Sequence, residues 1–262
     1  MTPKLMGVVN VTPDSFSDGG LYLDPERAIA HGEELARAGA AILDVGGEST
    51  RPGAEEVPAA EELRRVEPVV AGLASGDAAI SIDTSKATVA AAALDAGAGI
   101  VNDVTALRGD PGMAALCADR DATVVLMHMA GSPRTMQANP VYDDVVADVK
   151  AFLAARVEAA MAAGVGERRI WLDPGIGFGK TAAHNMELLR RLAELRELGR
   201  PLVIGTSRKS FIGKVDGSDA SARLGGTIAS SVLAAAEGAE VLRVHDVAEV
   251  GQAMAVAGAI LG

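Results

Sequence analysis

The sequence predicts an α/β fold in which eight parallel strands, each followed by a helix, close into a single (β/α)8 barrel. Short aliphatic runs alternate with longer amphipathic runs from one end of the chain to the other, as expected of repeated strand and helix units. The chain has 262 residues, close to the roughly 250 residues of such a barrel. It contains 30 glycines and 3% aromatic residues, so small aliphatic side chains must form the core, as in helix-covered parallel sheets.

Each expected strand is near the usual length of about five residues. In chain order the strands are residues 5–10, 42–45, 79–83, 100–103, 123–128, 170–173, 202–206 and 241–245. The alternative is an open, doubly wound sheet, but its G-x-G-x-x-G signature is absent because Val-Thr-Pro-Asp-Ser follows Asn10. No Ser/Pro-rich linker divides the chain. We therefore expect residues 1–262 to form one domain, with its active site at the carboxyl ends of the strands.

Helix start signals fill the gaps between these strands. Asp24-Pro25 and Asp110-Pro111 each predict an N-cap followed by proline at the first helical position. Thr181 predicts the cap of a helical stretch that ends at Gly199, and Asp246 predicts the start of the last helix. The order is strand and then helix throughout, which favours parallel strands.

Charge and composition exclude several classes of function. The net charge is −11 and Lys and Arg form no dense stripe, so nucleic acid is not an expected partner. No run of 18 apolar residues occurs, so neither a membrane span nor an export signal is expected. The only cysteine, Cys117, cannot form an internal disulfide. It indicates a reducing compartment, and we expect a cytoplasmic protein in which Cys117 is a core residue.

Polar residues end almost all of the expected strands. One polar residue in such a position is most often a helix cap or a turn former, but a barrel would bring all of them to one mouth. Carboxylate and amide groups end the early and middle strands, whereas cations follow the last two. The residues are Asn10, Asp44, Asp83, Asn102, Asp103, His128, Asp173, Ser207, Lys209, Arg243 and His245.

This division predicts the chemistry of the ligand. Carboxylate and amide groups suit a heterocycle with an N–H donor edge, which Asp173 could bind through both oxygens while Asp83 and Asn102 bind other ring positions. Cations after the last two strands lie where barrels commonly hold phosphate. Arg243 and His245 could instead be surface residues, but they are two apart on a strand and so share a face. The residues alone predict an enzyme acting on a phosphorylated heterocycle.

Two loops are longer than a barrel needs. Residues 11–20 and 46–53 combine glycine, proline and hydroxyl residues with a single Phe16 or Arg51. That composition is typical of lids that close over a site, although most loops rich in glycine and proline have no such role.

Two other sequence features resemble binding motifs but do not match them. Residues 175–181 resemble a phosphate-binding loop, but the pattern requires glycine at position 174, where Pro174 stands. Neither His128 nor His245 has sequence partners at the spacing of a transition-metal site.

Eight ordered blocks at the expected strand ends resemble the dihydropteroate synthases of bacterial folate synthesis. The resemblance runs from residue 6 to the C-terminus, and no motif position departs from the family pattern. Any single block would be weak, but eight in order are specific. The blocks are residues 10–20 (NVTPDSFSDGG), 44–54 (DVGGESTRPGA), 81–84 (SIDT), 101–104 (VNDV), 126–129 (LMHM), 173–180 (DPGIGFGK), 207–210 (SRKS) and 243–246 (RVHD).

The resemblance implies a transferase that joins 6-hydroxymethyl-7,8-dihydropterin pyrophosphate to p-aminobenzoate, giving 7,8-dihydropteroate and releasing pyrophosphate with Mg²⁺. It implies that pyrophosphate departs to leave a pterin methylene cation, which the aniline nitrogen attacks. Cations near the leaving oxygens and carboxylates near the ring would assist this step. The resemblance also implies a homodimer and inhibition by sulfonamides, which mimic p-aminobenzoate.

The resemblance further implies a role for each motif residue. The catalytic residues are Arg51, Asp83, Lys209, Arg243 and His245. The pterin site comprises Asp83, Asn102, Met127, Asp173, Phe178 and Lys209. The pyrophosphate site comprises Asn10, Thr50, Arg51, Arg243 and His245, with Asn10 also the metal ligand. The p-aminobenzoate site comprises Phe16, Thr50, Arg51, Pro52, Phe178, Ser207 and Lys209.

Two alternatives use the same ring-binding groups. A pterin-dependent methyltransferase would have no reason to keep Arg243, His245 and the 50–52 motif, because its leaving group is not pyrophosphate. A catalytically silent pterin-binding homologue would be expected to have lost Asp83, Lys209 or the loop motifs, all of which are present. We therefore expect an active synthase.

Overall fold

The computed structural model describes residues 2–12, 24–50, 53–131, 135–138 and 140–261. Its eight parallel strands are hydrogen-bonded in the order β6-β5-β4-β3-β2-β1-β8-β7, and a bridge between Leu172 and Leu202 joins the two ends of the sheet. The predicted barrel is therefore confirmed. The strands are β1 (Lys4–Asn10), β2 (Ile42–Gly46), β3 (Ala79–Asp83), β4 (Ile100–Asp103), β5 (Thr123–Met127), β6 (Ile170–Asp173), β7 (Val203–Ile204) and β8 (Val241–Val244).

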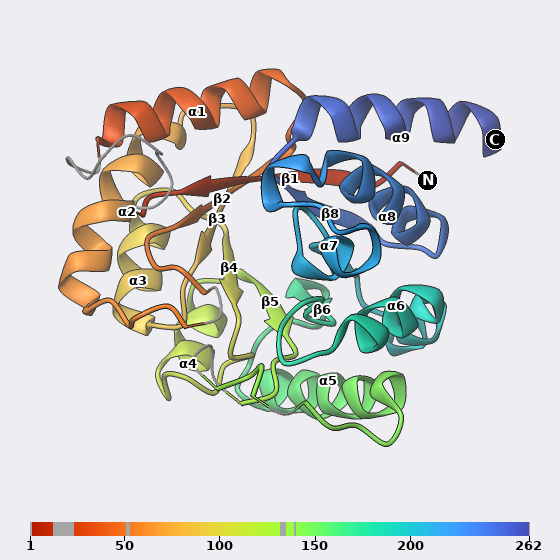
Figure 1. The fold of residues 1–262 in the computed structure, drawn as a ribbon. Helices are drawn as coiled ribbons and strands as arrows, with labels where there is room; N and C mark the ends of the chain where they lie inside the picture. The colour runs from red at the N-terminus through yellow and green to blue at the C-terminus, as the bar shows by residue number, and fades with distance from the viewer. Residues whose placement is uncertain (1, 13–23, 51–52, 132–134, 139, 262) are drawn as a thin grey trace.

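Helices surround the strands, and the chain begins beside β1 and ends at the tip of the last helix (Figure 1). In the described part of the chain, no helix is long and apolar enough to cross a membrane. The α-helices are α1 (Pro25–Arg37), α2 (Ala59–Leu73), α3 (Ala87–Asp95), α4 (Met113–Asp119), α5 (Val145–Ala162), α6 (Ala182–Arg190), α7 (Ser210–Asp216), α8 (Leu224–Ala236) and α9 (Val247–Leu261).

The sequence places most helix ends correctly. Asp24 caps α1 by accepting a hydrogen bond from the Glu26 amide, with Pro25 as the first helical residue. Thr181 caps α6 in a reciprocal capping box with His184. After Arg190 the chain continues as the 3-10 helix η3 (Leu192–Leu198) and ends at a left-handed Gly199, as expected of a glycine C-cap.

The expected cap at Asp110 is wrong. Helix α4 begins at Met113, two residues beyond Pro111. The Asp110 carboxylate instead accepts from the amides of Gly112 and Ala87. This aspartate therefore closes a turn and ties it to the start of α3, which removes it from the cap position of α4.

Strand β7 is the other departure, since it covers two residues where five were expected. Val203 and Ile204 pair with β8. Beyond them the chain leaves the ladder, and the hydroxyls of Thr206 and Ser207 contact Ser231 on α8 and His245. Side-chain bonds replace the ladder here, so the strand ends early.

The core has two main layers. One apolar cluster fills the space between strands and helices. A second closes the bottom of the barrel interior, with Trp171 packed against Met6, Ile42, Ile100, Val125, Val203 and Val241. Because the interior at this level is filled by side chains, as is usual for such barrels, only the opposite end is open to a ligand.

Candidate active site

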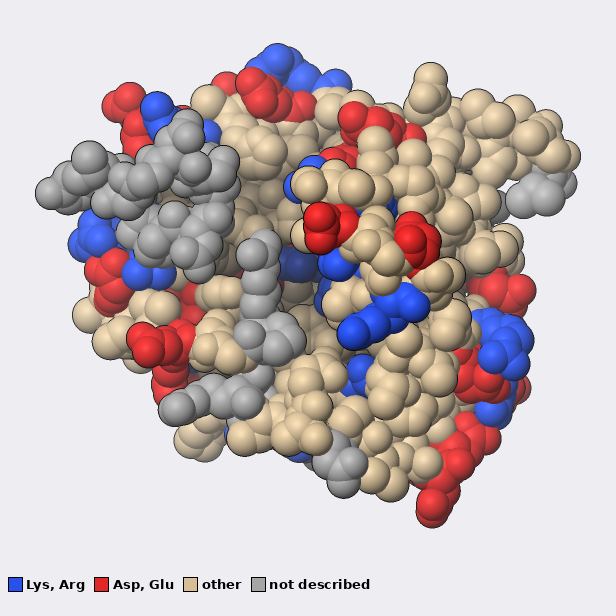
Figure 2. Space-filling model, in the orientation of Figure 1, with Lys and Arg blue, Asp and Glu red and all other residues tan. Residues whose placement is uncertain are grey.

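The two-residue repeat of the strands explains why the mouth of the barrel is polar. Side chains two positions after the apolar bottom layer point to the same interior, one level nearer the carboxyl ends. Ile42 is thus followed by Asp44, Ile100 by Asn102, Trp171 by Asp173 and Val241 by Arg243. Figure 2 shows Lys and Arg atoms gathered in and beside a hollow near the middle of one face.

An ion-pair network crosses the barrel interior at this level. Arg243 Nε donates to Asp44 Oδ2 at 2.6 Å, and Arg243 Nη2 donates to Asp83 Oδ2 at 2.9 Å. Asn102 Nδ2 also donates to Asp44 Oδ2, at 3.1 Å. The sequence predicted carboxylates and amides at the ends of the early and middle strands and cations after the last two. The structure pairs members of these two groups directly.

Burial tunes the charges of this network. Burial, together with the neighbouring Asp44 and against the opposing effect of Arg243, raises the pKa of Asp83 to about 7. Burial alone would lower the pKa of Arg243, but Asp44 and Asp83 outweigh it and hold the pKa above its ordinary value. Arg243 therefore stays charged, while Asp83 titrates near neutral pH.

Asp173 and Lys209 lie beside this network. Asp173 Oδ1 accepts from the Gly175 amide at 2.7 Å, and burial raises the pKa of its carboxyl. Burial lowers the pKa of Lys209 to about 8, although the neighbouring Asp173 opposes that shift. Since Asp83 and Arg243 also act on Lys209 electrostatically, four predicted site residues share one cluster.

An apolar wall borders these charges. Met127 packs with Val104, Met129 and Met136, and Phe178 lies against them. Lys209 Nζ lies 4.1 Å from the centre of the Phe178 ring, close enough for a cation–π contact. The same nitrogen donates to the Ile176 carbonyl at 2.8 Å. A flat ring could thus be held between apolar side chains and hydrogen-bonding groups.

A second polar group lies at the ends of β7 and β8. Ser207 Oγ and His245 Nδ1 are 2.9 Å apart, and the His245 amide donates to the same hydroxyl at 3.2 Å. The two residues come from different predicted subsites, and the structure brings them together.

The remaining predicted residues are either half-buried or outside the described part of the chain. Asn10 ends β1 and is half-buried, and Thr50 is half-buried in the loop after β2. Phe16, Arg51 and Pro52 lie outside the described residues, as do most of loop 11–20 and part of loop 46–53. Among the residues that the structure describes, no three His, Cys, Asp or Glu side chains are grouped to hold a metal ion.

Two strand-end residues do not face the mouth. Asp103 follows Asn102, and its carboxylate accepts from the Thr105 and Leu107 amides. His128 follows Met127, and its ring packs edge-on against Phe152 of α5 with centroids 4.8 Å apart. Neighbours on a strand point to opposite faces, so these two turn toward the helices. The expectation that all strand-end polar groups converge is wrong for both.

Sequence reasoning missed two residues. Asp44 was assigned to the mouth without a role, yet it is fully buried and accepts from both Arg243 and Asn102. Lys180 was considered only within a rejected phosphate-loop motif, yet it is almost fully buried beside the site. The sequence shows only that a lysine follows a glycine-rich run at a strand end, and its burial could not be read from that pattern.

Residues 6–245 match the family model of the pterin binding enzymes. The dihydropteroate synthase of Neisseria meningitidis serogroup C is 50% identical over 249 residues, covering 94% of this chain and 88% of that protein. The Yersinia pestis dihydropteroate synthase, solved with a sulfonamide drug, has a TM-score of 0.95 and 45% identity, with 99% of this chain and 94% of that chain covered. The Xanthomonas albilineans enzyme, solved with 4-aminobenzoic acid, has a TM-score of 0.94 and 51% identity, with 99% and 93% covered. The chain therefore belongs to the pterin-binding enzyme family, and within it to the dihydropteroate synthases.

Proposed function

We propose that the mouth of the barrel binds the two substrates of dihydropteroate synthase in adjacent subsites, a pterin pyrophosphate and p-aminobenzoate. The observation that carries this proposal is the buried cluster in which Asp83, Asp173 and Lys209 lie beside Arg243. Carboxylates suit the donor edge of an aminopyrimidine ring, and the cations suit its leaving group. One cluster could thus both bind the ring and assist the departure of pyrophosphate.

The pterin ring would lie among Asp83, Asn102 and Asp173. Asp173 keeps one oxygen bonded to the Gly175 amide, which leaves the second free to accept from the ring. Lys209 would donate to a ring acceptor, and Met127 and Phe178 would cover the ring faces from the apolar wall.

The pyrophosphate would be bound by Asn10, Thr50, Arg51, Arg243 and His245. Arg243 has its Nε and Nη2 committed to Asp44 and Asp83, so Nη1 is the nitrogen left to meet a phosphate oxygen. His245 is held by Ser207. We propose that the charge of the leaving group develops against these cations, which lowers the barrier to its departure.

Mg²⁺ fits this subsite as an ion shared with the substrate. A protein cage is absent among the described residues, and only the Asn10 side chain offers a neutral oxygen at the end of β1. Mg²⁺ is usually held by one or two protein oxygens together with substrate phosphates and water. When bound, the ion would add positive charge near the phosphate oxygens.

The p-aminobenzoate would lie against Phe178, Ser207 and Lys209, with Phe16, Thr50, Arg51 and Pro52 completing the subsite from the two long loops. Sulfonamides would compete for the same place. The Yersinia pestis relative solved with a sulfonamide drug and the Xanthomonas albilineans relative solved with 4-aminobenzoic acid support this assignment.

The reaction itself needs little acid–base help. The bond between the pterin methylene carbon and the pyrophosphate oxygen breaks, and its electron pair leaves with pyrophosphate. The aniline nitrogen then forms the new carbon–nitrogen bond and loses a proton to water. An aniline is neutral and nucleophilic at pH 7, so the residues act by orienting both partners and by placing Asp83 near the transient positive charge.

A pyrophosphate-release assay tests this function. We expect release only when the pterin pyrophosphate and p-aminobenzoate are both present. Binding of the pterin without release, with either substrate alone or both, would identify a silent homologue. Methyl transfer from a methylated pterin supplied in a separate assay, with no release of pyrophosphate here, would identify a methyltransferase.

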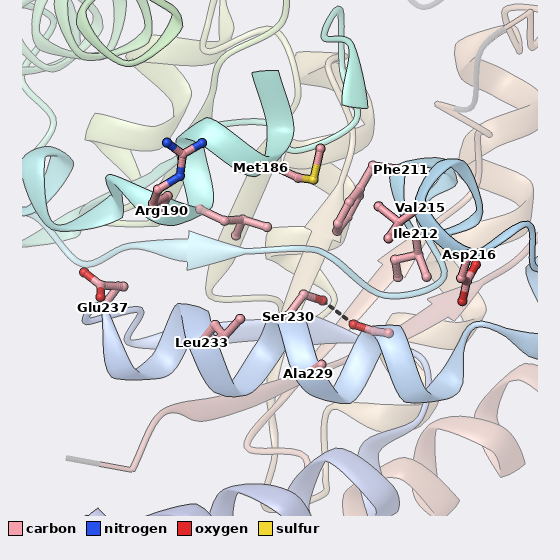
Figure 3. Close-up of a pocket in the computed structure, with 12 residues that line it drawn as sticks. Met186, Arg190, Phe211, Ile212, Val215, Asp216, Ala229, Ser230, Leu233 and Glu237 are labelled. Atoms are coloured by element: carbon pink, nitrogen blue, oxygen red, sulfur yellow. Dashed lines mark hydrogen bonds between the residues drawn. The ribbon is translucent and has the colours of Figure 1, made fainter. Parts of the chain in front are cut away.

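We further propose that the protein is a homodimer that associates through α6, α7 and α8. These helices line an apolar pocket of about 480 Å³ (Figure 3), in which Met186 of α6, Val215 of α7 and Leu233 of α8 take part. All three side chains are exposed, Val215 and Leu233 by 67% and 64%. Apolar patches of this kind mark protein–protein interfaces. A second copy is the occupant that the family resemblance implies.

Two broader assignments complete the proposal. The free cysteine Cys117 is buried, and burial raises the pKa of its thiol to about 12, so it is an inert core residue. An unpaired cysteine of this kind supports a reducing, cytoplasmic location. We also propose that residues 1–262 act as one domain, because the barrel uses elements from β1 to α9.

A further inference from the structure

Hydrogen bonds from side chains hold the backbone of the loop between β6 and α6. Each of its five successive carbonyls, from residue 175 to residue 179, accepts a hydrogen bond from a side chain. Lys180 donates to the carbonyls of Gly175 and Phe178, Lys209 to that of Ile176, Gln137 to that of Gly177 and Tyr142 to that of Gly179, at distances of 2.7–3.0 Å.

The backbone of this loop requires such support. Gly175, Gly177 and Gly179 all have positive φ angles, a conformation that favours glycine. At Gly175 there is no room for a side chain, since a Cβ there would lie 1.9 Å from the His128 carbonyl oxygen. Within the loop, the Phe178 amide donates to the Gly175 carbonyl at 3.0 Å, while the hydrogen bonds to the other four carbonyls come from side chains. Buried carbonyls without partners are costly, so the side chains must satisfy them.

Lys180 is the centre of this arrangement. Its side chain is 3% exposed, and Nζ lies 2.9 Å from His128 Nδ1, 3.0 Å from the Gly175 carbonyl and 2.9 Å from the Phe178 carbonyl. An ammonium group has three N–H donors. Three close acceptors therefore match it, although no carboxylate is among its hydrogen-bond partners in the described chain.

The histidine partner is neutral. Burial and, to a smaller extent, the Lys180 charge lower the pKa of His128 to about 3. Because Nδ1 accepts from Lys180, the ring proton is on Nε2. Burial also lowers the pKa of Lys180 to about 7, against the opposing effect of Asp173. The contact joins the end of β5 to the loop after β6, and so links two adjacent strands at the mouth.

We propose that Lys180 is a positioning residue of the synthase, whose ammonium group fixes the β6–α6 loop so that Asp173 and Phe178 are preformed for the pterin. The loop reaches Asp173 through the Gly175 amide, which donates to Oδ1, and it reaches Phe178 through that residue's own carbonyl. The inference rests on the proposed function, because that function assigns both residues to the pterin subsite. Lys180 Nζ is directed at His128 and at the loop carbonyls, so this role requires no contact with a substrate.

The test compares Lys180→Met, which keeps the length of the side chain and removes its donors, with the folded wild type. We expect the dissociation constant for 6-hydroxymethyl-7,8-dihydropterin pyrophosphate to rise about tenfold or more, as for the loss of charged hydrogen bonds in a buried site. The KM for p-aminobenzoate should rise as well, while kcat at saturation changes less. Amide hydrogen exchange at residues 175–179 should become faster.

One further variant is a control for the loss of a lysine charge, and a second removes a different hydrogen bond to the loop. Lys150→Met removes a lysine whose partner is Glu197, and it should leave binding and exchange unchanged. Tyr142→Phe removes only the donor to Gly179, so it should shift both measurements in the same direction as Lys180→Met, by less. If Lys180→Met does not fold, Tyr142→Phe and a matching Gln137→Ala decide the question.

The outcomes separate the inference from the proposed function. If Lys180→Met has a lower unfolding midpoint but wild-type affinity and KM when folded, Lys180 is only structural and the inference is overturned. The variant Asp173→Asn provides the second arm. Weaker binding in Asp173→Asn with unchanged binding in the loop variants would overturn the inference alone, whereas unchanged binding in Asp173→Asn would overturn the proposed pterin site.

Discussion

Arg243 and Asp44 form an ion pair across the barrel interior, with Nε 2.6 Å from Oδ2 and with Asp44 completely buried. Arg243 extends from β8, and Asp44 from β2, on the far side of β1. The pair orients the guanidinium, so that Nη2 also reaches Asp83. Asp44 thus sets the direction of the group proposed to meet the pyrophosphate.

Asp44→Asn should therefore destabilise the protein and impair the anion subsite. Loss of the charged partner should reduce the free energy of unfolding by about 1.5–3 kcal/mol, the usual cost for a hydrogen bond between charged groups. Urea unfolding measures this change. The matched control is Asp95→Asn, which removes an exposed partner of Arg120 and should change stability little. Equal effects of the two substitutions would show that burial of the Asp44 pair is unimportant.

The sequence suffices to predict the barrel and its polar mouth because both depend on local patterns. Strand ends and helix caps are set by neighbours in the chain, and parallel strands bring their carboxyl ends together. The same two-residue period could also have excluded Asp103 and His128, because each directly follows an inward-facing residue. The alternation of side chains between the two faces of a strand therefore predicts that these two residues point away from the mouth.

Other features could not be read from the sequence. The pairing of Arg243 with Asp83 joins residues 160 positions apart, and it depends on which interior side chains face one another across the barrel. The role of Lys180 depends on carbonyls that point inward only because three glycines adopt positive φ. Both features arise from tertiary geometry, for which no local pattern exists.

Arg243→Ala should affect binding and stability together. Pyrophosphate and pterin pyrophosphate should bind much more weakly, whereas the pterin alcohol, which lacks phosphate, should lose less affinity. Two buried carboxylates would also lose their partner, and breaking a buried pair in this way costs about 3–5 kcal/mol of stability. Calorimetric titrations with the three ligands measure the first effect. Equal losses for the alcohol and the pyrophosphate would remove Arg243 from the anion subsite.

Asp83 should give opposite pH dependences of activity and stability. Its folded-state pKa of about 7 lies above the ordinary value of 3.8. Protonation as the pH falls through about 7 would remove the negative charge proposed to lie near the pterin, so kcat/KM should fall. The contribution of Asp83 to stability has the opposite pH dependence. Because the pKa of Asp83 is higher in the folded protein than in the unfolded chain, this contribution is fully present below about pH 3.8 and is lost as the pH rises through about 7.

Asp83→Asn separates these two effects. Relative to the wild type, the variant should gain stability at pH 8 compared with pH 5, because it no longer buries a charge at the higher pH. Titrating groups that do not interact with Asp83 cancel in this difference. Its residual activity should lack the acidic limb near pH 7. A constant stability difference between the two pH values would mean that Asp83 does not titrate in this range.

Leu233→Lys should disrupt the proposed homodimer. A charge placed in the apolar surface of α6, α7 and α8 would have to be buried on association, which is unfavourable. Sedimentation equilibrium at micromolar concentration should detect a monomer. Val256→Lys is the matched control, since Val256 is also exposed, at 55%, but lies on α9. A monomeric wild type, or dissociation caused by Val256→Lys, would contradict the proposed interface.

Asp173→Asn should weaken pterin binding by about 2–4 kcal/mol, because it places a donor where only acceptors are useful. Oδ1 of Asp173 accepts from the Gly175 amide at 2.7 Å. In the variant, the amide group of Asn must turn its nitrogen toward either the Gly175 N–H or the ring donors, and each choice brings two donors together. A pterin analogue that lacks one donor on the edge facing Asp173 provides the control. It should bind the wild type less tightly than the parent pterin does, yet lose little further affinity in the variant, since contacting groups are not additive. Calorimetry of both ligands against both proteins measures this coupling. If the two losses simply add, the carboxylate does not contact that edge of the ring.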